Sequence, residues 1–265
     1  MNHLLPLLLA AAILLAGNGL QGTLITLRAN LEGFDPVLIG LLGTAYFAGF
    51  ALSCLMTPHL IRSVGHIRVF SALAALAAAG TLALVLIIDP YVWMLIRFTT
   101  GYCFAGLFTV MESWLAAASK NADRGRVLSV YRLIDLLAVT GVQFLLPVFG
   151  TAGFELFAVI AIFFAMSLVP VSLADRSSPK PPEAFSFDLR TVWAISPMAC
   201  SGVLSLGLTT SAFRLIGPLY AEGVGLSVAG VALFMSAGIV GGAVLQLPFG
   251  YLSDRFDRRW MVILA

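Results

Sequence analysis

The sequence has few charged residues and no pattern typical of an enzyme site. Only 11% of its 265 residues are Asp, Glu, Lys or Arg, less than half of the roughly 25% found in soluble domains. Its cysteines, Cys54, Cys103 and Cys200, have neither disulfide nor metal-ligand spacing and are expected to be small buried apolar residues. The histidines are scattered, and the sequence contains no nucleotide-binding loop or nucleic-acid-binding patch. These absences argue against an enzyme, a cofactor or metal, and a nucleic-acid partner.

Apolar residues make up 60% of the chain, and the mean hydropathy is +1.00. A bilayer core about 30 Å thick needs about 20 apolar residues per helix, and lipid favours helices because backbone groups must bond to one another. The sequence therefore predicts an all-α membrane protein surrounded by the lipid bilayer. Eight spans are expected at approximately residues 4–27, 37–60, 69–88, 92–117, 127–149, 153–173, 193–220 and 227–250, and a ninth begins at Trp260.

Lysine and arginine are distributed unevenly between the loops. Arg28 is the only one in one set of alternate loops. The opposite set holds Arg62, Arg68, Lys120, Arg124, Arg126, Arg176, Lys180, Arg190, Arg255, Arg258 and Arg259. Because these residues collect in cytoplasmic loops, we predict a multi-pass protein of the bacterial inner (plasma) membrane with a cytoplasmic N-terminus.

A polar stretch and a repeat predict two halves. Residues 175–191, DRSSPKPPEAFSFDLRT, are interpreted as a cytoplasmic linker between an N-terminal six-helix bundle (1–174) and the start of a second bundle (192–265). Glu32 and Gly40 are echoed 190 residues later by Glu222 and Gly230, each pair opening the second helix of its half. Two such units need roughly 380 residues and twelve helices, so we expect about 120 residues to be missing after Ala265.

Several motifs resemble the major facilitator superfamily (MFS). GYLSDRFDRRW resembles its loop motif GxxxDRxGRR through Gly250, Asp254, Arg255, Arg258 and Arg259, with Asp257 where the family usually has Gly. The loop after the second span keeps Gly65 and Arg68, with Arg62 where the family's gating aspartate stands. The resemblance implies an MFS fold and a gating role for these loops.

Further segments are similar to the YcaD-type bacterial branch of this superfamily. RFTTGYCFAG, with Arg97 and Gly101, resembles the family's RxxxG motif. ESWL at 112–115, NADRGRVLSVY at 121–131 and GPLYAEGVG at 217–225 are similar to segments of the branch. The resemblance covers the whole chain and implies transport, without a defined substrate. The GPxxGG-like run of drug and proton antiporters is absent from the fifth span, which weakens a drug-efflux interpretation.

Ionisable residues inside membrane spans are candidates for function, because each costs roughly 2.5 to 3.5 kcal/mol to insert. At 1.5 Å per residue, Glu112, Arg132 and Asp135 lie about 12, 9 and 13 Å from the cytoplasmic loop, so we expect one cluster. Two interpretations remain open for it. The cluster is either a structural clamp or a proton-coupling site in which one carboxylate carries the proton.

Other polar residues in the spans are candidates for a substrate cavity. Arg97, also a proton-coupling candidate, and Arg214 lie near the outer ends of their helices and either extend to the interface or bind. Two arginines facing one cavity would favour an anionic substrate. Asn18 and Gln21 on the first helix either line the cavity or bond between helices, and Gln143 returns to the helix face of Arg132.

The sequence as a whole predicts a secondary active transporter that moves a small solute by alternating access. No nucleotide-binding motif is present, so an ion gradient is the expected energy source, with protons as the first choice. Two alternatives remain open. An uncoupled facilitator needs no titrating carboxylate, and a non-transporting membrane receptor or scaffold would commonly add a soluble domain.

Overall fold

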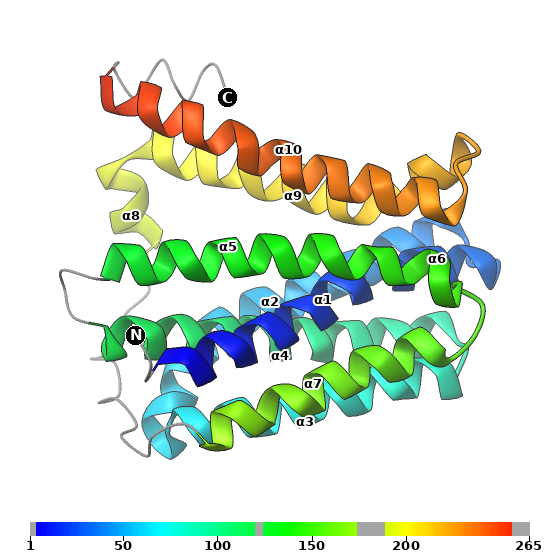
Figure 1. Cartoon of the computed structure of the whole chain (residues 1–265), viewed down its shortest axis with the longest axis horizontal. Helices are drawn as coiled ribbons and strands as arrows, with labels where there is room; N and C mark the ends of the chain where they lie inside the picture. The colour runs from blue at the N-terminus through cyan, green and yellow to red at the C-terminus, as the bar shows by residue number, and fades with distance from the viewer. Residues whose placement is uncertain (1–3, 120–123, 174–188, 256–265) are drawn as a thin grey trace.

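The computed structural model describes residues 4–119, 124–173 and 189–255, the last ten of these by their backbone (Figure 1). In this part of the chain the regular elements are helices. They are α1 (Leu5–Leu31), α2 (Pro36–Val64), α3 (His66–Leu86), α4 (Pro90–Ala118), α5 (Arg124–Val142), the 3-10 turn η2 (Gln143–Leu145), α6 (Leu146–Phe149), α7 (Glu155–Leu173), α8 (Leu189–Ile195), α9 (Pro197–Gly223) and α10 (Val228–Arg255).

Eight helical segments are long and apolar enough to cross a membrane. Each overlaps one of the eight predicted spans, and α5, η2 and α6 together make the fifth. The predicted fold class is therefore confirmed for the described residues. The predicted ninth helix, and all but the last residues of the predicted linker, lie outside the described residues; α8 already begins at Leu189.

Proline with a polar N-cap residue sets where several helices begin. Asp89 Oδ1 accepts hydrogen bonds of 2.9 Å from the backbone N–H groups of Tyr91 and Val92 at the start of α4, and Asp35 caps α2 in the same way. The same arrangement corrects one expectation. The span predicted as continuous from 193 to 220 is interrupted at Ser196, which caps α9, because a residue that precedes proline disfavours the helical conformation.

The two repeats end their first helix with the same turn. After α1, Gly33 has a φ of 76°, and after α9, Gly225 has a φ of 85°. Three backbone hydrogen bonds close each turn from equivalent positions, so that Asn30 corresponds to Glu222. The predicted repeat is therefore present, but the alignment of Glu32 with Glu222 was wrong by two residues. That alignment matched the two glutamates, whereas the turns correspond through Gly33 and Gly225, because each turn needs glycine at its left-handed position.

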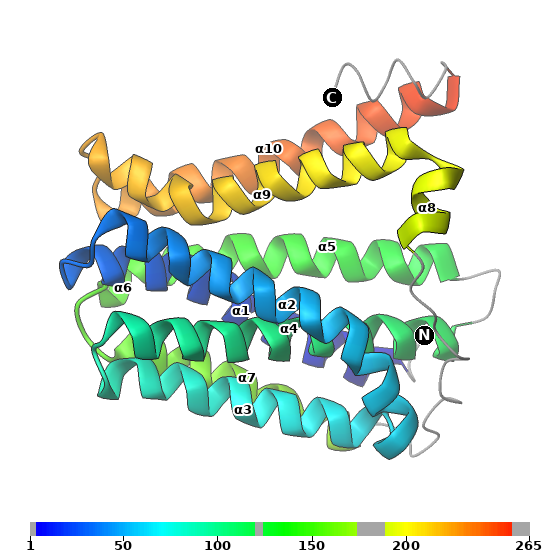
Figure 2. The ribbon, with the colours of Figure 1, turned by 180° about the vertical axis from the view of Figure 1, so that it is seen from behind.

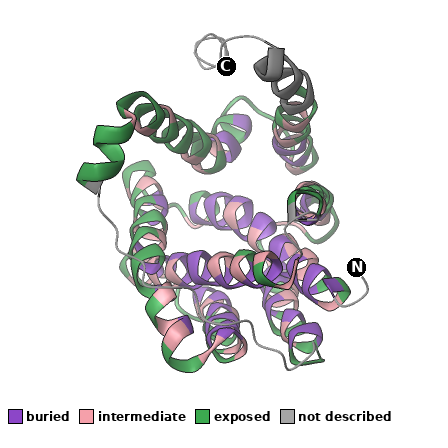
Figure 3. Ribbon diagram, turned by 90° about the vertical axis from the view of Figure 1, so that its left-hand side faces the viewer, coloured by how far each residue is buried: buried purple, intermediate pink, exposed green. Residues whose placement is uncertain are grey.

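Helices α1 to α7 form one bundle, and α9 with α10 forms a second layer beside it (Figures 1 and 2). The α9–α10 pair approaches the bundle near α6 and diverges from it toward α8. Its contacts with the bundle run from α9 to α1 and α2, and from α10 to α5, η2 and α6. Figure 3 shows that the buried residues concentrate on the inward faces of the first bundle, whereas most of α9 is exposed.

Candidate functional site

Helices α2 and α4 cross with their backbones in contact. A Cβ atom on Gly49 of α2 would collide with the backbone of Phe98 and Tyr102, and one on Gly101 of α4 would collide with the backbone of Tyr46. Small residues allow such an approach between membrane helices. Tyr46 lies three residues before Gly49, and Arg97 four residues before Gly101, so the crossing sets these two side chains against each other.

Arg97 lies over the face of the Tyr46 ring, with its Cζ atom 4.2 Å from the ring centroid. The residue is only 7% exposed, and its Nε atom is buried without a hydrogen-bond partner. Within the described residues its guanidinium makes neither a hydrogen bond nor an ion pair. A desolvated cation–π contact is worth about 2 kcal/mol, less than the several kcal/mol that burying an ion costs. The charge of Arg97 is therefore only partly compensated by this contact.

The interpretation in which Arg97 extends to the interface is not supported, because the side chain is enclosed beside Tyr46. Tyr46 was missed from the sequence. Its hydroxyl donates a 3.3 Å hydrogen bond to Asn18 Oδ1 on α1, and its ring is within 6.5 Å of three phenylalanine rings, those of Phe47, Phe50 and Phe104. The sequence did contain a signal for Tyr46, because this tyrosine lies three residues before Gly49, a small residue suited to packing against the helix that carries the RxxxG motif.

Arg214 connects the second layer with this site. It lies exposed on α9 and interacts electrostatically with Tyr46 and with Asp135 of α5. The next residue, Leu215, packs onto Gly43 of α2, one turn before the tyrosine on which Arg97 rests, so Arg214 lies near this site. The structure thus brings Asn18, Arg97 and Arg214 into one neighbourhood.

Glu112, Arg132 and Asp135 also lie together. Arg132 Nη2 is 3.6 Å from Glu112 Oε1 on α4, and Arg132 Nη1 is 3.8 Å from Asp135 Oδ2 one turn away on α5. The side chain of Arg132 is 68% exposed, that of Glu112 is 47% exposed and that of Asp135 is 27% exposed. Both ion pairs are long and partly open, which is a geometry in which partners exchange at little cost.

Gln21 and Gln143, in contrast, hold helices together. Gln21 Nε2 donates to Thr81 Oγ1 on α3 at 2.7 Å, and Gln143 Nε2 donates to the carbonyl oxygen of Gly19 on α1 at 3.1 Å. Each residue is 1% exposed. The interpretation of Gln21 as an interhelical hydrogen-bond donor is therefore favoured over a place in the substrate cavity, and the same geometry applies to Gln143.

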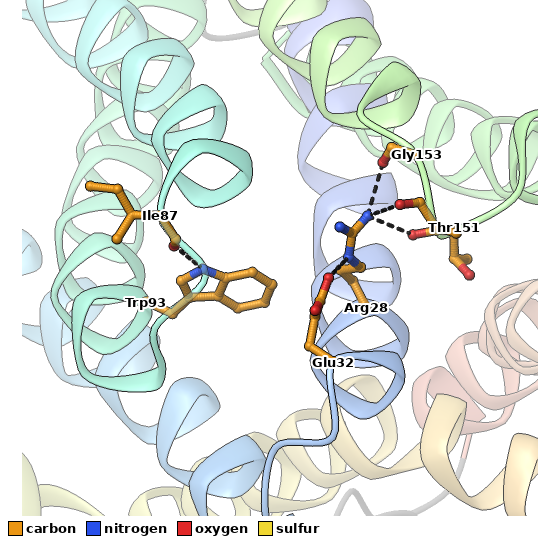
Figure 4. A network of polar contacts seen from close by, with 7 residues as sticks. Arg28, Glu32, Ile87, Trp93, Thr151 and Gly153 are labelled. Carbon is orange, nitrogen blue, oxygen red and sulfur yellow. Dashed lines mark hydrogen bonds and ion pairs between the residues drawn. The ribbon is translucent and has the colours of Figure 1, made fainter.

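A polar network fixes the ends of the helices near α6 (Figure 4). Arg28 pairs with Glu32 at 2.6 Å and donates to the backbone carbonyls of Thr151, Ala152 and Gly153, which tie α1 to the loop before α7. Trp93 Nε1 donates to the carbonyl oxygen of Ile87 at 2.8 Å. The only arginine of the predicted outer loops is thus a structural residue.

The second layer contacts the first bundle at this same end. Asn30 Nδ2 donates to Glu222 Oε2 at 2.9 Å, and the side chain of Leu215 on α9 packs onto Gly43 of α2. Farther in, Ser236 Oγ of α10 lies 3.5 Å from the carbonyl oxygen of Thr140. These contacts all join the second layer to the first bundle.

The loop motifs are placed in part. Gly65, with a φ of 85°, separates α2 from α3, and Arg68 is exposed in the first turn of α3. Gly250, Asp254 and Arg255 belong to the helical backbone of α10, which continues five residues beyond the predicted end of that span. Arg258 and Arg259 lie outside the described residues.

The ESWL segment has two structural contacts besides the Glu112 ion pair. His66 Nε2 lies 3.2 Å from Ser113 Oγ. The His66 ring also packs against the Trp114 ring, with the two ring centroids 5.9 Å apart. This histidine is buried at the start of α3. His66, one of the scattered histidines of the sequence, therefore joins α3 to α4.

The fold and these sites define a polytopic helical membrane protein with charged residues between its helices. The chain belongs to the Major Facilitator Superfamily, whose family profile matches residues 7–265. That family consists of membrane transporters.

Curated relatives are similar along almost the whole chain. An uncharacterized MFS-type transporter, YcaD, of Escherichia fergusonii is 25% identical over 260 residues, which cover 97% of this chain and 66% of the relative. An uncharacterized MFS-type transporter of Enterobacter sp. strain 638 is 26% identical over 260 residues, covering 96% of this chain and 65% of the relative. The chain thus spans just under two thirds of the length of these relatives.

Solved structures of transporters share the fold. The nucleoside transporter NupG superposes with a TM-score of 0.76 at 13% identity, covering 97% of this chain and 69% of that one. A bacterial homolog of the human lysosomal transporter Spinster, in an inward-facing and occupied conformation, gives a TM-score of 0.76 at 17% identity and covers 97% of this chain and 62% of that one. At these identities the likeness concerns the fold alone.

Proposed function

We propose that the protein is a secondary active transporter that moves a small solute across the bilayer by alternating access, coupled to protons. The observation that carries the coupling is the position of Arg132 between the carboxylates of Glu112 and Asp135, at 3.6 and 3.8 Å. A carboxylate that exchanges an arginine partner for a proton is a common device for coupling. The partly exposed, long ion pairs favour such an exchange over the alternative of a fixed clamp.

The asymmetric contact between the halves supports alternating access. The α9–α10 pair meets the first bundle near α6, at the end that holds the Asn30–Glu222 hydrogen bond, and diverges from it toward α8 (Figure 1). In transporters of this kind one bundle rocks against the other around a site near the midplane. The charge distribution assigns the α6 end to the outside. In this proposal the conformation is inward-facing, the N-terminus is cytoplasmic and the membrane is a bacterial inner membrane.

The test is transport by the full-length protein in proteoliposomes that contain an internal pH dye. Adding pooled metabolites or toxic compounds should produce a substrate-dependent pH change, and Glu112→Gln or Asp135→Asn should reduce it at least about tenfold. Substrate flux without a pH change would select the uncoupled facilitator, and the charged cluster would then be structural. Specific binding with no flux of any solute would select a membrane receptor.

A further inference from the structure

The charge of Arg97 has no acidic partner within the described part of the chain. The guanidinium rests on the Tyr46 ring at 4.2 Å, and its Nε atom is buried without a hydrogen-bond acceptor. The acidic residues that the structure does pair are engaged elsewhere: Glu32 with Arg28, Glu222 with Asn30, and Glu112 and Asp135 with Arg132. A buried cation left without a protein counter-ion keeps a desolvation cost that a bound anion would offset.

We propose that Arg97, Tyr46 and Asn18, together with Arg214, bind the carboxylate of a small organic anion, which is the transported solute. This inference rests on the proposed transport function and adds the chemical class of the substrate. Helices α1, α2 and α4 supply Asn18, Tyr46 and Arg97, and the close crossing at Gly49 and Gly101 holds the last two in register.

A second arginine, from the second layer, lies near this place. Arg214 of α9 interacts electrostatically with both Tyr46 and Asp135. Its neighbour Leu215 packs onto Gly43, one turn before Tyr46 on α2, and the Tyr46 ring carries Arg97. Two guanidinium groups repel each other unless a negative charge lies between them, and their planar donors match a carboxylate. An anion that engages both arginines would join the two halves, which is what a transported substrate must do at a site between rocking bundles.

The surroundings of the arginines indicate an anion with an apolar part. The Tyr46 ring lies 5.3 Å from that of Phe47 and 6.3 Å from that of Phe50. The hydroxyl of Tyr46 and the amide of Asn18 are the polar groups bonded to each other at the same place. Aromatic surface with few polar groups is typical of sites for organic ligands rather than for strongly hydrated inorganic ions.

The inference is tested by ligand-dependent thermal unfolding of the purified full-length protein in detergent. The probes are acetate, benzoate and succinate, with acetamide, benzamide and succinamide as uncharged counterparts, inorganic phosphate as an inorganic anion, and sodium chloride to equalise ionic strength. At least one carboxylate should raise the melting temperature while its amide does not. Arg97→Gln should weaken the apparent affinity for that carboxylate about tenfold or more.

Arg126→Gln is the matched control, because it removes an arginine that is exposed at the start of α5 and outside the site. It should leave carboxylate binding unchanged. The proposal is overturned if carboxylates and amides stabilise equally, if phosphate stabilises as well as any carboxylate, if no carboxylate exceeds chloride, or if the double variant Arg97→Gln, Arg214→Gln binds the carboxylate normally. Binding is measured without a gradient, so a failure of proton coupling and a failure of anion binding are seen separately.

Discussion

Asn30 and Glu222 occupy equivalent positions of the two repeats and bond to each other, with Nδ2 of Asn30 2.9 Å from Oε2 of Glu222. Asn30 lies near the end of α1 and Glu222 near the end of α9. The bond therefore marks the place where the repeats touch at the end near α6, and it must break if the halves separate there.

The first prediction concerns this contact. Cross-linking Asn30→Cys to Glu222→Cys with a short bis-maleimide, in a variant in which Cys54, Cys103 and Cys200 are replaced, should stop solute flux through the full-length protein, because the bundles can no longer part at this end. Each single cysteine variant treated in the same way is the control and should retain flux. Full flux in the cross-linked protein would show that this end does not open during transport.

The second prediction concerns the crossing of α2 and α4. Gly49→Ala and Gly101→Ala should each lower stability by about 1 to 3 kcal/mol, because the added methyl group meets backbone atoms of the facing helix and forces the helices apart. The measurement is thermal unfolding in detergent. Gly40→Ala on α2 is the matched control, since nothing lies within 4 Å of its added Cβ, and it should be neutral or slightly stabilising. Equal effects at all three positions would contradict the close crossing.

The third prediction separates the ring of Tyr46 from its hydroxyl. Tyr46→Leu removes the face on which Arg97 rests and should cost about 2 kcal/mol of stability. Tyr46→Phe keeps that face and loses only the long hydrogen bond to Asn18, so about 1 kcal/mol or less is expected. Thermal unfolding of both variants decides the matter. If Phe were as harmful as Leu, the hydroxyl rather than the ring would be the group that matters.

The fourth prediction concerns the charged cluster. Glu112→Gln and Asp135→Asn should each leave folding intact while reducing proton-coupled flux at least about tenfold, because a neutral amide cannot carry the proton. Glu155→Gln at the start of α7, outside the cluster, is the control and should transport normally. The measurement is the pH signal in proteoliposomes together with thermal unfolding. Normal transport in both cluster variants would assign the cluster a structural role.

The positions of Gln21 and Gln143 show where sequence reasoning is weakest. Hydropathy predicted that both lie inside the membrane, and both do lie on membrane-spanning segments. Which way a polar side chain points around the helix depends on the neighbouring helices, and the structure turns Gln21 toward Thr81 and Gln143 toward Gly19. The approach of Glu112 to Arg132 was predictable, because two consecutive helices and a rise of 1.5 Å per residue place these residues at one depth.

The sequence by itself determined the eight membrane-spanning helices and the repeat, because the free energy of burying apolar residues in lipid and the conformational needs of glycine and proline are local properties. Only the tertiary structure decided that Arg97 rests on Tyr46 and that Asn30 meets Glu222. These relationships depend on how far helices distant in sequence approach one another. That distance follows from the packing of whole helix faces, here from Gly49 and Gly101, and not from any one segment.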